Sequence, residues 1–219
     1  MLTLDSAYKF IAKDYRGTLM FCLLAAIAVF IPIVGALLLM GLSIRIISNS
    51  INQHDEIPKV FGNFGNDVMN GLKYMLFGFI LMIPFMAIFA GSLNGIISAS
   101  MSNDISSMTD IALSMGVLWI LILVLTFAYI LVVPALTANY AKEQKFGAFF
   151  EINKAFSIVF GDFGAYLKMI GINFLYSIAI GFISGILSFT AIVPLLASPL
   201  MILVNGKIMG EWYSEASKK

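Results

Sequence analysis

Few residues in this chain of 219 amino acids have the chemistry for catalysis or metal binding. His54 is the single histidine, and it stands beside Asp55 and Glu56 in a polar stretch. Two carboxylates and an imidazole can ligate a transition metal, so an intramembrane metalloenzyme is one hypothesis. A lone loop histidine beside acidic residues is more typical of a solvated segment. Because HExxH, P-loop and Gly-x-Ser-x-Gly motifs are missing, we expect no enzyme activity and no metal or cofactor.

Polar side chains inside long apolar runs form a second group with functional potential. They are Ser92, Asn94, Ser114, Thr126, Tyr129, Asn173, Tyr176, Ser177 and Ser184. An unsatisfied amide in hydrocarbon costs on the order of several kcal/mol, so each asparagine must face another helix or a wet cavity. Hydrogen bonding between helices is the structural interpretation. The functional interpretation is that Asn94, Asn173 and Tyr176 provide the polar lining of a solute path.

The composition identifies the kind of protein that positions these residues. Hydrophobic residues make up 60% of the chain and charged residues 11%, against about 25% charged in a soluble domain. The stretches without Asp, Glu, Lys or Arg are 17–44, 74–103, 111–141 and 169–206. A membrane span needs about 20 mostly apolar residues, so these stretches predict a polytopic membrane protein. A net charge of +1 indicates no nucleic-acid partner, and the single cysteine, Cys22, excludes a disulfide framework.

The distribution of basic residues favours six spans over five. The 17–44 stretch is long enough for one tilted helix or for two short helices that turn back near Pro32. With two helices, all thirteen Lys and Arg residues lie on one face of the membrane, as the positive-inside rule requires. We therefore expect both termini to be cytoplasmic in a multi-pass protein of the cell membrane. The predicted spans lie near 17–31, 34–48, 72–98, 111–138, 165–187 and 190–210, after an interfacial helix near 4–11.

An internal repeat accompanies these spans. Val60-Phe61-Gly62-Asn63-Phe64-Gly65 recurs as Val159-Phe160-Gly161-Asp162-Phe163-Gly164, with five identical positions of six. We interpret 1–219 as a single transmembrane domain, an all-α helical bundle with interfacial amphipathic helices, in which 34–98 resembles 111–187. The repeated aromatic residues predict either a structural corner at the interface or a docking or lipid head-group site. The candidate interfacial residues are Phe61, Gly62, Phe64, Phe160, Gly161 and Phe163.

Two blocks of sequence carry a family resemblance. The first is Gly41-x-x-x-Arg45, then Asp55-Glu56-x-Pro58-x-x-Phe61, then Gly71-Leu72-Lys73. The second runs from Pro134 to Ala141 and continues as Phe146-Gly147-Ala148-x-Phe150. Together they resemble the archaeal membrane proteins catalogued as domain of unknown function 4013. The resemblance implies a multi-span membrane protein and no established activity.

Two functional hypotheses follow from these residues. The first is a non-enzymatic membrane scaffold or binding protein, whose partners are membrane lipids and, as further candidates, other membrane proteins or a second copy of the chain. The alternative is a small transporter or channel for a neutral or lipid-like solute. No carboxylate or basic residue falls near the middle of a predicted span, so the sequence does not favour ion-coupled transport.

Overall fold

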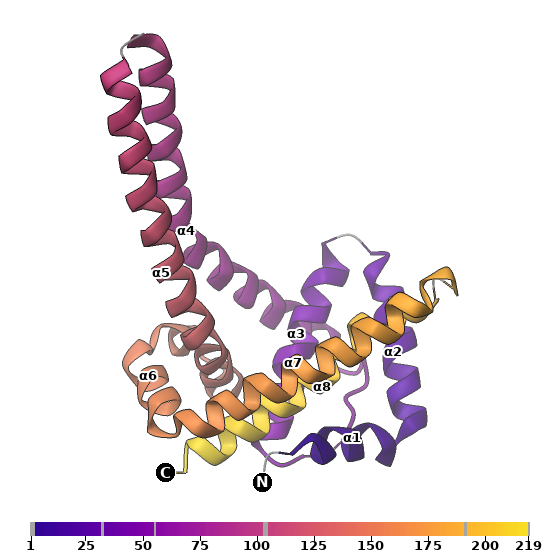
Figure 1. Ribbon diagram of the computed structural model, residues 1–219. Helices are drawn as coiled ribbons and strands as arrows, with labels where there is room; N and C mark the ends of the chain where they lie inside the picture. The colour runs from indigo at the N-terminus through magenta and orange to yellow at the C-terminus, as the bar shows by residue number, and fades with distance from the viewer. Residues whose placement is uncertain (1–2, 32, 55, 103–104, 191, 219) are drawn as a thin grey trace. The chain divides into compact units, whose positions relative to one another are not determined.

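The computed structural model describes residues 3–31, 33–54, 56–102, 105–190 and 192–218, and these residues form helices and no strands (Figure 1). The all-α prediction is therefore confirmed over the described part of the chain. The chain divides into two compact units. Unit 1 comprises Met1–Met75 and Pro134–Lys219, and unit 2 comprises Leu76–Val133.

Helices of very different lengths follow one another along the chain. The α-helices are α1 (Leu4–Lys13), α2 (Tyr15–Val29), α3 (Val34–Ile51), α4 (Phe64–Ser102), α5 (Ile105–Glu143), α6 (Ile152–Gly161), α7 (Phe163–Ile186) and α8 (Ile192–Ala216). Two short 3₁₀ helices, η1 (Phe146–Phe150) and η2 (Ser188–Thr190), precede α6 and α8.

Among the described residues, five helices are long and apolar enough to cross a membrane, which makes this a multi-pass membrane protein. The candidate spans are Val34–Ile51, Phe64–Asn94, Gly116–Glu143, Phe163–Ile186 and Val193–Ala216. The sixth predicted span corresponds to α2, which has 15 residues. At about 1.5 Å per residue, α2 is shorter than a hydrocarbon core of about 30 Å, so length alone supports five spans and not the sixth.

The first apolar stretch contains two helices, as the distribution of basic residues predicted. α2 ends at Val29 and α3 begins at Val34. Ile33, which precedes α3, has a φ of 62°, a conformation that β-branched residues rarely adopt. Pro32, at the predicted turn, lies outside the described residues.

Side-chain caps fix where the N-terminal helices begin. The Thr3 hydroxyl accepts a hydrogen bond from the Ser6 backbone N–H at 3.2 Å, at the start of α1. The Asp14 carboxylate accepts from the Gly17 N–H at 2.8 Å and caps α2. A side chain at position 17 would overlap this carboxylate, so Gly17 suits the cap. The predicted N-terminal amphipathic helix is thus present as α1, with Ala7 and Phe10 buried.

The centre of unit 1 is α8, which packs against α2, α3 and α7. Gly206 and Gly210 allow the close approach to α3, because a Cβ at either position would overlap atoms of Ile46, Ile47 or Ser50. The main cluster of buried apolar side chains draws on α1, α2, α3 and α8 and on Val60, which lies between α3 and α4. It contains Phe10, Phe21, Cys22, Ala25, Ala28, Leu38, Leu42, Ile46, Val60 and Leu203.

Unit 2 consists of the helical segments 76–102 and 105–133, and most of its described apolar side chains are exposed. Tyr129 links the two segments: its hydroxyl donates to the Leu81 carbonyl at 3.1 Å, and its ring lies 5.4 Å from that of Phe85. α4 continues to Ser102 and α5 begins at Ile105, so most of the segment 99–110, which separates the predicted spans 72–98 and 111–138, is helical. Exposed apolar helices of this kind suit a lipid environment.

Candidate functional site

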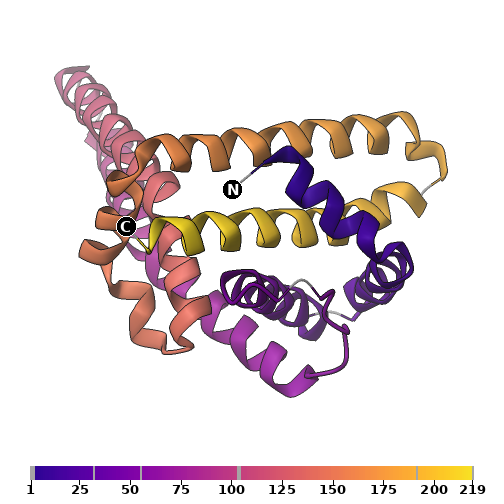
Figure 2. The same cartoon turned by 90° about the horizontal axis from the view of Figure 1, so that it is seen from below.

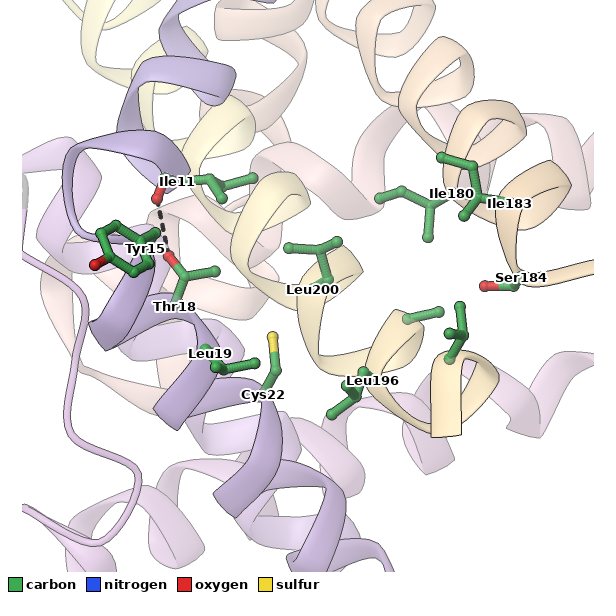
Figure 3. Close-up of a pocket in the computed structure, with 12 residues that line it drawn as sticks. Ile11, Tyr15, Thr18, Leu19, Cys22, Ile180, Ile183, Ser184, Leu196 and Leu200 are labelled. Carbon is green, nitrogen blue, oxygen red and sulfur yellow. Dashed lines mark hydrogen bonds between the residues drawn. The ribbon is translucent and has the colours of Figure 1, made fainter. Parts of the chain in front are cut away.

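Unit 1 contains an apolar cavity of about 360 Å³ (Figure 3). It lies between α2 and α7 and reaches α8; Figure 3 shows Cys22 on one side, Ile180 on the other and Leu200 between them. The lining residues are Ile11, Tyr15, Thr18, Leu19, Cys22, Ile180, Ile183, Ser184, Val193, Leu196, Ala197 and Leu200. Nearly all of the atoms that face the cavity are carbon or sulfur, so the cavity is suited to hydrocarbon.

Helical periodicity brings these side chains to one place. Tyr15, Thr18, Leu19 and Cys22 recur at spacings of three, four or seven, which places them on one face of α2, and Ile11 joins them from the end of α1. Ile180, Ile183 and Ser184 follow the same pattern on α7. On α8 the pattern runs from Val193 to Leu200. Each helix thus contributes one stripe of apolar side chains, and the cavity forms where the three stripes face one another.

The three hydroxyl groups of the cavity differ in their hydrogen bonding. The Thr18 hydroxyl donates to the Ile11 carbonyl at 3.1 Å, and the Tyr15 hydroxyl accepts from Arg16 Nε at 3.1 Å. Ser184 Oγ is buried and has no hydrogen-bond partner in the described part of the chain. Its oxygen points into the cavity (Figure 3). Among the described lining residues, Ser184 is therefore the hydroxyl that is buried without a hydrogen-bond partner.

Helix α1 lies across α8, from α7 towards α2, beside the cavity (Figure 2). Two hydrogen bonds hold its first turn. The Tyr176 hydroxyl donates to the Leu4 carbonyl at 2.7 Å, and the Ser6 hydroxyl donates to Glu211 Oε2 at 2.7 Å. Because Ile11 lines the cavity, these bonds help to fix one of its walls.

Two cations near the predicted spans are paired with carboxylates. Lys207 Nζ lies 3.1 Å from Glu211 Oε1 and 5.2 Å from the centre of the Phe10 ring. Arg45 Nη2 lies 3.3 Å from Asp67 Oδ2 and donates to the Lys59 carbonyl at 2.5 Å. Each of these two cations is thus paired with a carboxylate inside the protein.

The Arg45–Asp67 pair lies where α3 crosses the start of α4. A Cβ at Gly41 would overlap the main-chain carbonyl of Asp67, and a Cβ at Gly71 would overlap that of Leu37. Glycine is required at both positions because the two backbones touch. The Gly-x-x-x-Arg and Gly-Leu-Lys motifs are thereby explained as parts of one helix crossing.

The candidate polar lining falls in different surroundings. Asn94 belongs to unit 2 and is exposed, whereas Asn173 and Tyr176 lie three residues apart on α7 in unit 1. Asn173 Nδ2 donates to the Met169 sulfur at 3.3 Å, and its Oδ1 is buried without a partner among the described residues. Tyr176 does not line the cavity. Its hydroxyl donates to the Leu4 carbonyl and so helps to hold α1, which contributes Ile11 to the lining.

The repeated aromatic residues share one environment. Phe61, Phe64, Phe160 and Phe163 are all exposed, and so are Gly62 and Gly161. In the first copy the rings of Phe61 and Phe64 lie 6.3 Å apart. In the second copy Phe160 is stacked between Phe156 at 5.7 Å and Phe163 at 5.6 Å. Exposed rings at two helix starts are suited to the membrane–water interface.

A second, more polar cavity of about 370 Å³ lies among α5, α6 and α8. Lys142, Lys154 and Tyr213 are among its lining residues. Burial alone would lower the pKa of Lys154, but its hydrogen bonds to Glu143 and Glu151 outweigh this effect and raise it. Lys154 is therefore a charged group already neutralised by its neighbours.

The histidine cluster does not assemble into a metal site among the described residues. His54 is exposed, and no group of three His, Cys, Asp or Glu side chains within the described ranges is arranged to hold a metal ion. Asp55, the central member of the cluster, lies outside those ranges.

Sequence reasoning singled out Ser184 as a buried polar residue but did not predict the cavity. The available signal was the helical spacing of Tyr15, Thr18, Leu19 and Cys22, which places them on one face of α2. That spacing does not indicate which other helix faces it. Asp67, the partner of Arg45, was also missed, because no spacing rule connects residues on two different helices.

A family model described as "Protein of unknown function (DUF4013)" matches residues 24–189. No curated protein and no solved structure matches the chain.

Proposed function

We propose that this chain, which belongs to the DUF4013 family of proteins of unknown function, is a non-catalytic membrane protein that binds lipid. The observation that carries this proposal is the apolar cavity between α2, α7 and α8. Ligand pockets are typically about 300–1,000 Å³ and lined mainly by apolar side chains, and the cavity meets both criteria.

Hydrocarbon is the occupant that suits this lining. A water molecule in a cavity needs two to four polar partners, and Ser184 offers one. A polar metabolite would lose its hydration without equivalent hydrogen bonds. An acyl or prenyl chain has no polar groups that lose hydrogen bonds to water, and the surrounding membrane supplies acyl chains at high concentration.

The orientation and location remain those that the basic residues favour. We propose a cell-membrane protein in which the short helix α2 crosses as a sixth span, so that both termini are cytoplasmic, because this arrangement places the thirteen Lys and Arg residues on one side. The exposed Phe61 and Phe163 would then lie at the cytoplasmic interface. Lipid is the proposed partner, and a second copy or another membrane protein is a further candidate.

The test is native mass spectrometry of protein purified in mild detergent. Ala197→Trp places an indole in the cavity, since Ala197 lines it. Ala128→Trp is the matched control, because Ala128 is exposed in unit 2. We expect wild type and Ala128→Trp to retain lipid, and Ala197→Trp to lose most of it. Equal retention by a folded Ala197→Trp variant would overturn the proposal.

Transport of a neutral or lipid-like solute is a second candidate, and the observation that favours it is Asn173. Its buried Oδ1 lacks a partner in the described residues, as expected for a group that meets a solute. Reconstituted vesicles with a fluorescent lipid distinguish the functions. Accelerated movement of the lipid between leaflets that Asn173→Leu abolishes would support transport. Movement at the rate of protein-free vesicles would leave lipid binding as the function.

A further inference from the structure

The hydrogen bonding of Ser184 differs from that of two other serines in long helices, Ser92 and Ser177. The Ser92 hydroxyl donates to the Ile88 carbonyl at 2.9 Å, and the Ser177 hydroxyl donates to the Asn173 carbonyl at 2.8 Å. Bonding of this kind to the carbonyl four residues earlier is the usual way for a serine to be satisfied within a helix. Ser184 Oγ is buried and makes no such bond.

The direction of the Ser184 side chain indicates which group could bond to its hydroxyl. Its oxygen points into a cavity whose other two hydroxyls, on Thr18 and Tyr15, already have partners. A buried hydroxyl without a partner is unfavourable, because it has lost its hydrogen bonds to water and gained none in the protein. A ligand oxygen that reaches Ser184 removes this cost and also satisfies its own hydrogen-bonding group.

We propose that the ligand of the cavity is a long-chain lipid with a hydroxyl or carbonyl oxygen that hydrogen-bonds to Ser184 Oγ. This inference rests on the proposed lipid-binding function and specifies the class of lipid. Ser184 lies near the C-terminal end of α7, and the opposite end of the lining is formed by Ile11 and Tyr15 of α1 and α2. The oxygen is therefore placed near the α7–α8 corner, with the chain extending towards α1.

The single cysteine provides a reporter inside the cavity. Cys22 lines the cavity and is 5% exposed, and no other thiol is present to react. A ligand in the cavity covers Cys22 and slows its alkylation by N-ethylmaleimide. No labelling site needs to be engineered.

The experiment compares 1-dodecanol with dodecane, which differ by one hydroxyl group. Each is added to delipidated protein at a known mole fraction in the micelle, and the alkylation rate of Cys22 is measured. For wild type we expect dodecanol to give half-maximal protection at a mole fraction about fivefold lower than dodecane, the ratio for one net hydrogen bond. Ser184→Ala removes this preference, and Ser184→Thr, which keeps a hydroxyl, preserves it.

Ser177→Ala is the matched control on the same helix, because its hydroxyl is bonded to the Asn173 carbonyl and is absent from the cavity lining. This variant should keep the preference for dodecanol. Equal protection by both probes in wild type, or an unchanged preference in Ser184→Ala, would overturn the role of Ser184 and leave lipid binding intact. Protection by neither probe would overturn both the inference and the proposed function.

Discussion

The two copies of the repeated hexapeptide have the same pattern of exposed and buried side chains, but the buried residue that follows each copy makes a different contact. In both copies the leading valine, Val60 or Val159, is buried and the phenylalanines are exposed. In both copies the Asn or Asp precedes a new helix: Asn63 stands before α4 and Asp162 before α7. The shared residues therefore anchor a turn and begin a helix.

The copies diverge one turn into the helix. Position 67 corresponds to position 166, because the copies are 99 residues apart (159 − 60 and 166 − 67). Asp67 and Tyr166 are both fully buried. Asp67 pairs with Arg45, whereas the Tyr166 ring lies 5.2 Å from that of Trp212. The same hexapeptide thus leads into an ionic contact in one place and an aromatic contact in the other.

The largest expected effect is at the ionic contact. Asp67→Ala leaves the Arg45 guanidinium, 18% exposed, without its carboxylate, and should lower the free energy of unfolding by about 3–5 kcal/mol. Unfolding in mixed micelles measures it. Asp5→Ala, which removes an exposed ion pair with Lys9, is the control and should change stability by less than about 1 kcal/mol. Equal losses of stability in the two variants would contradict the interpretation of Arg45 and Asp67 as a buried ion pair.

The aromatic contact should be weaker. Tyr166→Leu keeps an apolar side chain but removes the ring contacts with Trp212 and Phe163, at 5.2 Å and 6.3 Å. We expect a loss of about 2 kcal/mol, since each aromatic pair contributes about 0.5–1.5 kcal/mol. The same unfolding measurement applies, with the exposed Tyr8→Leu as the control. A loss as large as that of Asp67→Ala would remove the distinction between the two corners.

The caps should differ by a smaller amount. Asp162 accepts a hydrogen bond from the Ala165 backbone N–H at 3.0 Å, so Asp162→Ala should cost about 1 kcal/mol. Asn63 accepts instead from the Asn66 side chain at 3.0 Å, so Asn63→Ala should cost only about 0.3 kcal/mol. If the order of the two effects is reversed, the two copies begin their helices differently from what is described above.

The smallest effect is expected on the outer face. Phe64 is 43% exposed, and Phe64→Ser should change the free energy of unfolding in detergent by no more than about 0.5 kcal/mol. Buried Phe77, 1% exposed, provides the contrast, since Phe77→Ser should be strongly destabilising. A large loss for Phe64→Ser would place this ring in a protein contact and not at the membrane interface.

Much of the fold was predictable because a chain segment that crosses lipid must satisfy its own backbone hydrogen bonds and carry few charged side chains. Runs without charge marked the long helices, and the basic residues correctly required a break between α2 and α3. The extension of α4 and α5 over most of 99–110 was not predicted. Serines and Asp110 resemble a loop by composition, but serine is only a weak helix breaker, and hydrogen bonding along an existing helix outweighs its preference.

The candidate site was less predictable, for a physical reason. A leucine that faces lipid and one that faces a cavity have the same chemistry, so Leu196 and Leu200 carry no signal in the sequence. Ser184 was recognisable as a polar residue in an apolar run, but its missing hydrogen bond is a property of the folded chain. Asn94 and Asn173 are alike in the sequence, since each is an asparagine within a long apolar run, but they belong to different units.

The central claim is that a lipid chain occupies the cavity between α2, α7 and α8, and photo-cross-linking locates that chain directly. A phospholipid with a diazirine in its acyl chain is incorporated into membranes containing the protein, unbound lipid is removed during purification, and the retained lipid is then activated by light. We predict that peptide mapping finds adducts in residues 15–22, 180–184 and 193–200, and that Ala197→Trp removes them. Adducts confined to the exposed helices of unit 2, with none in these three segments, would contradict the account.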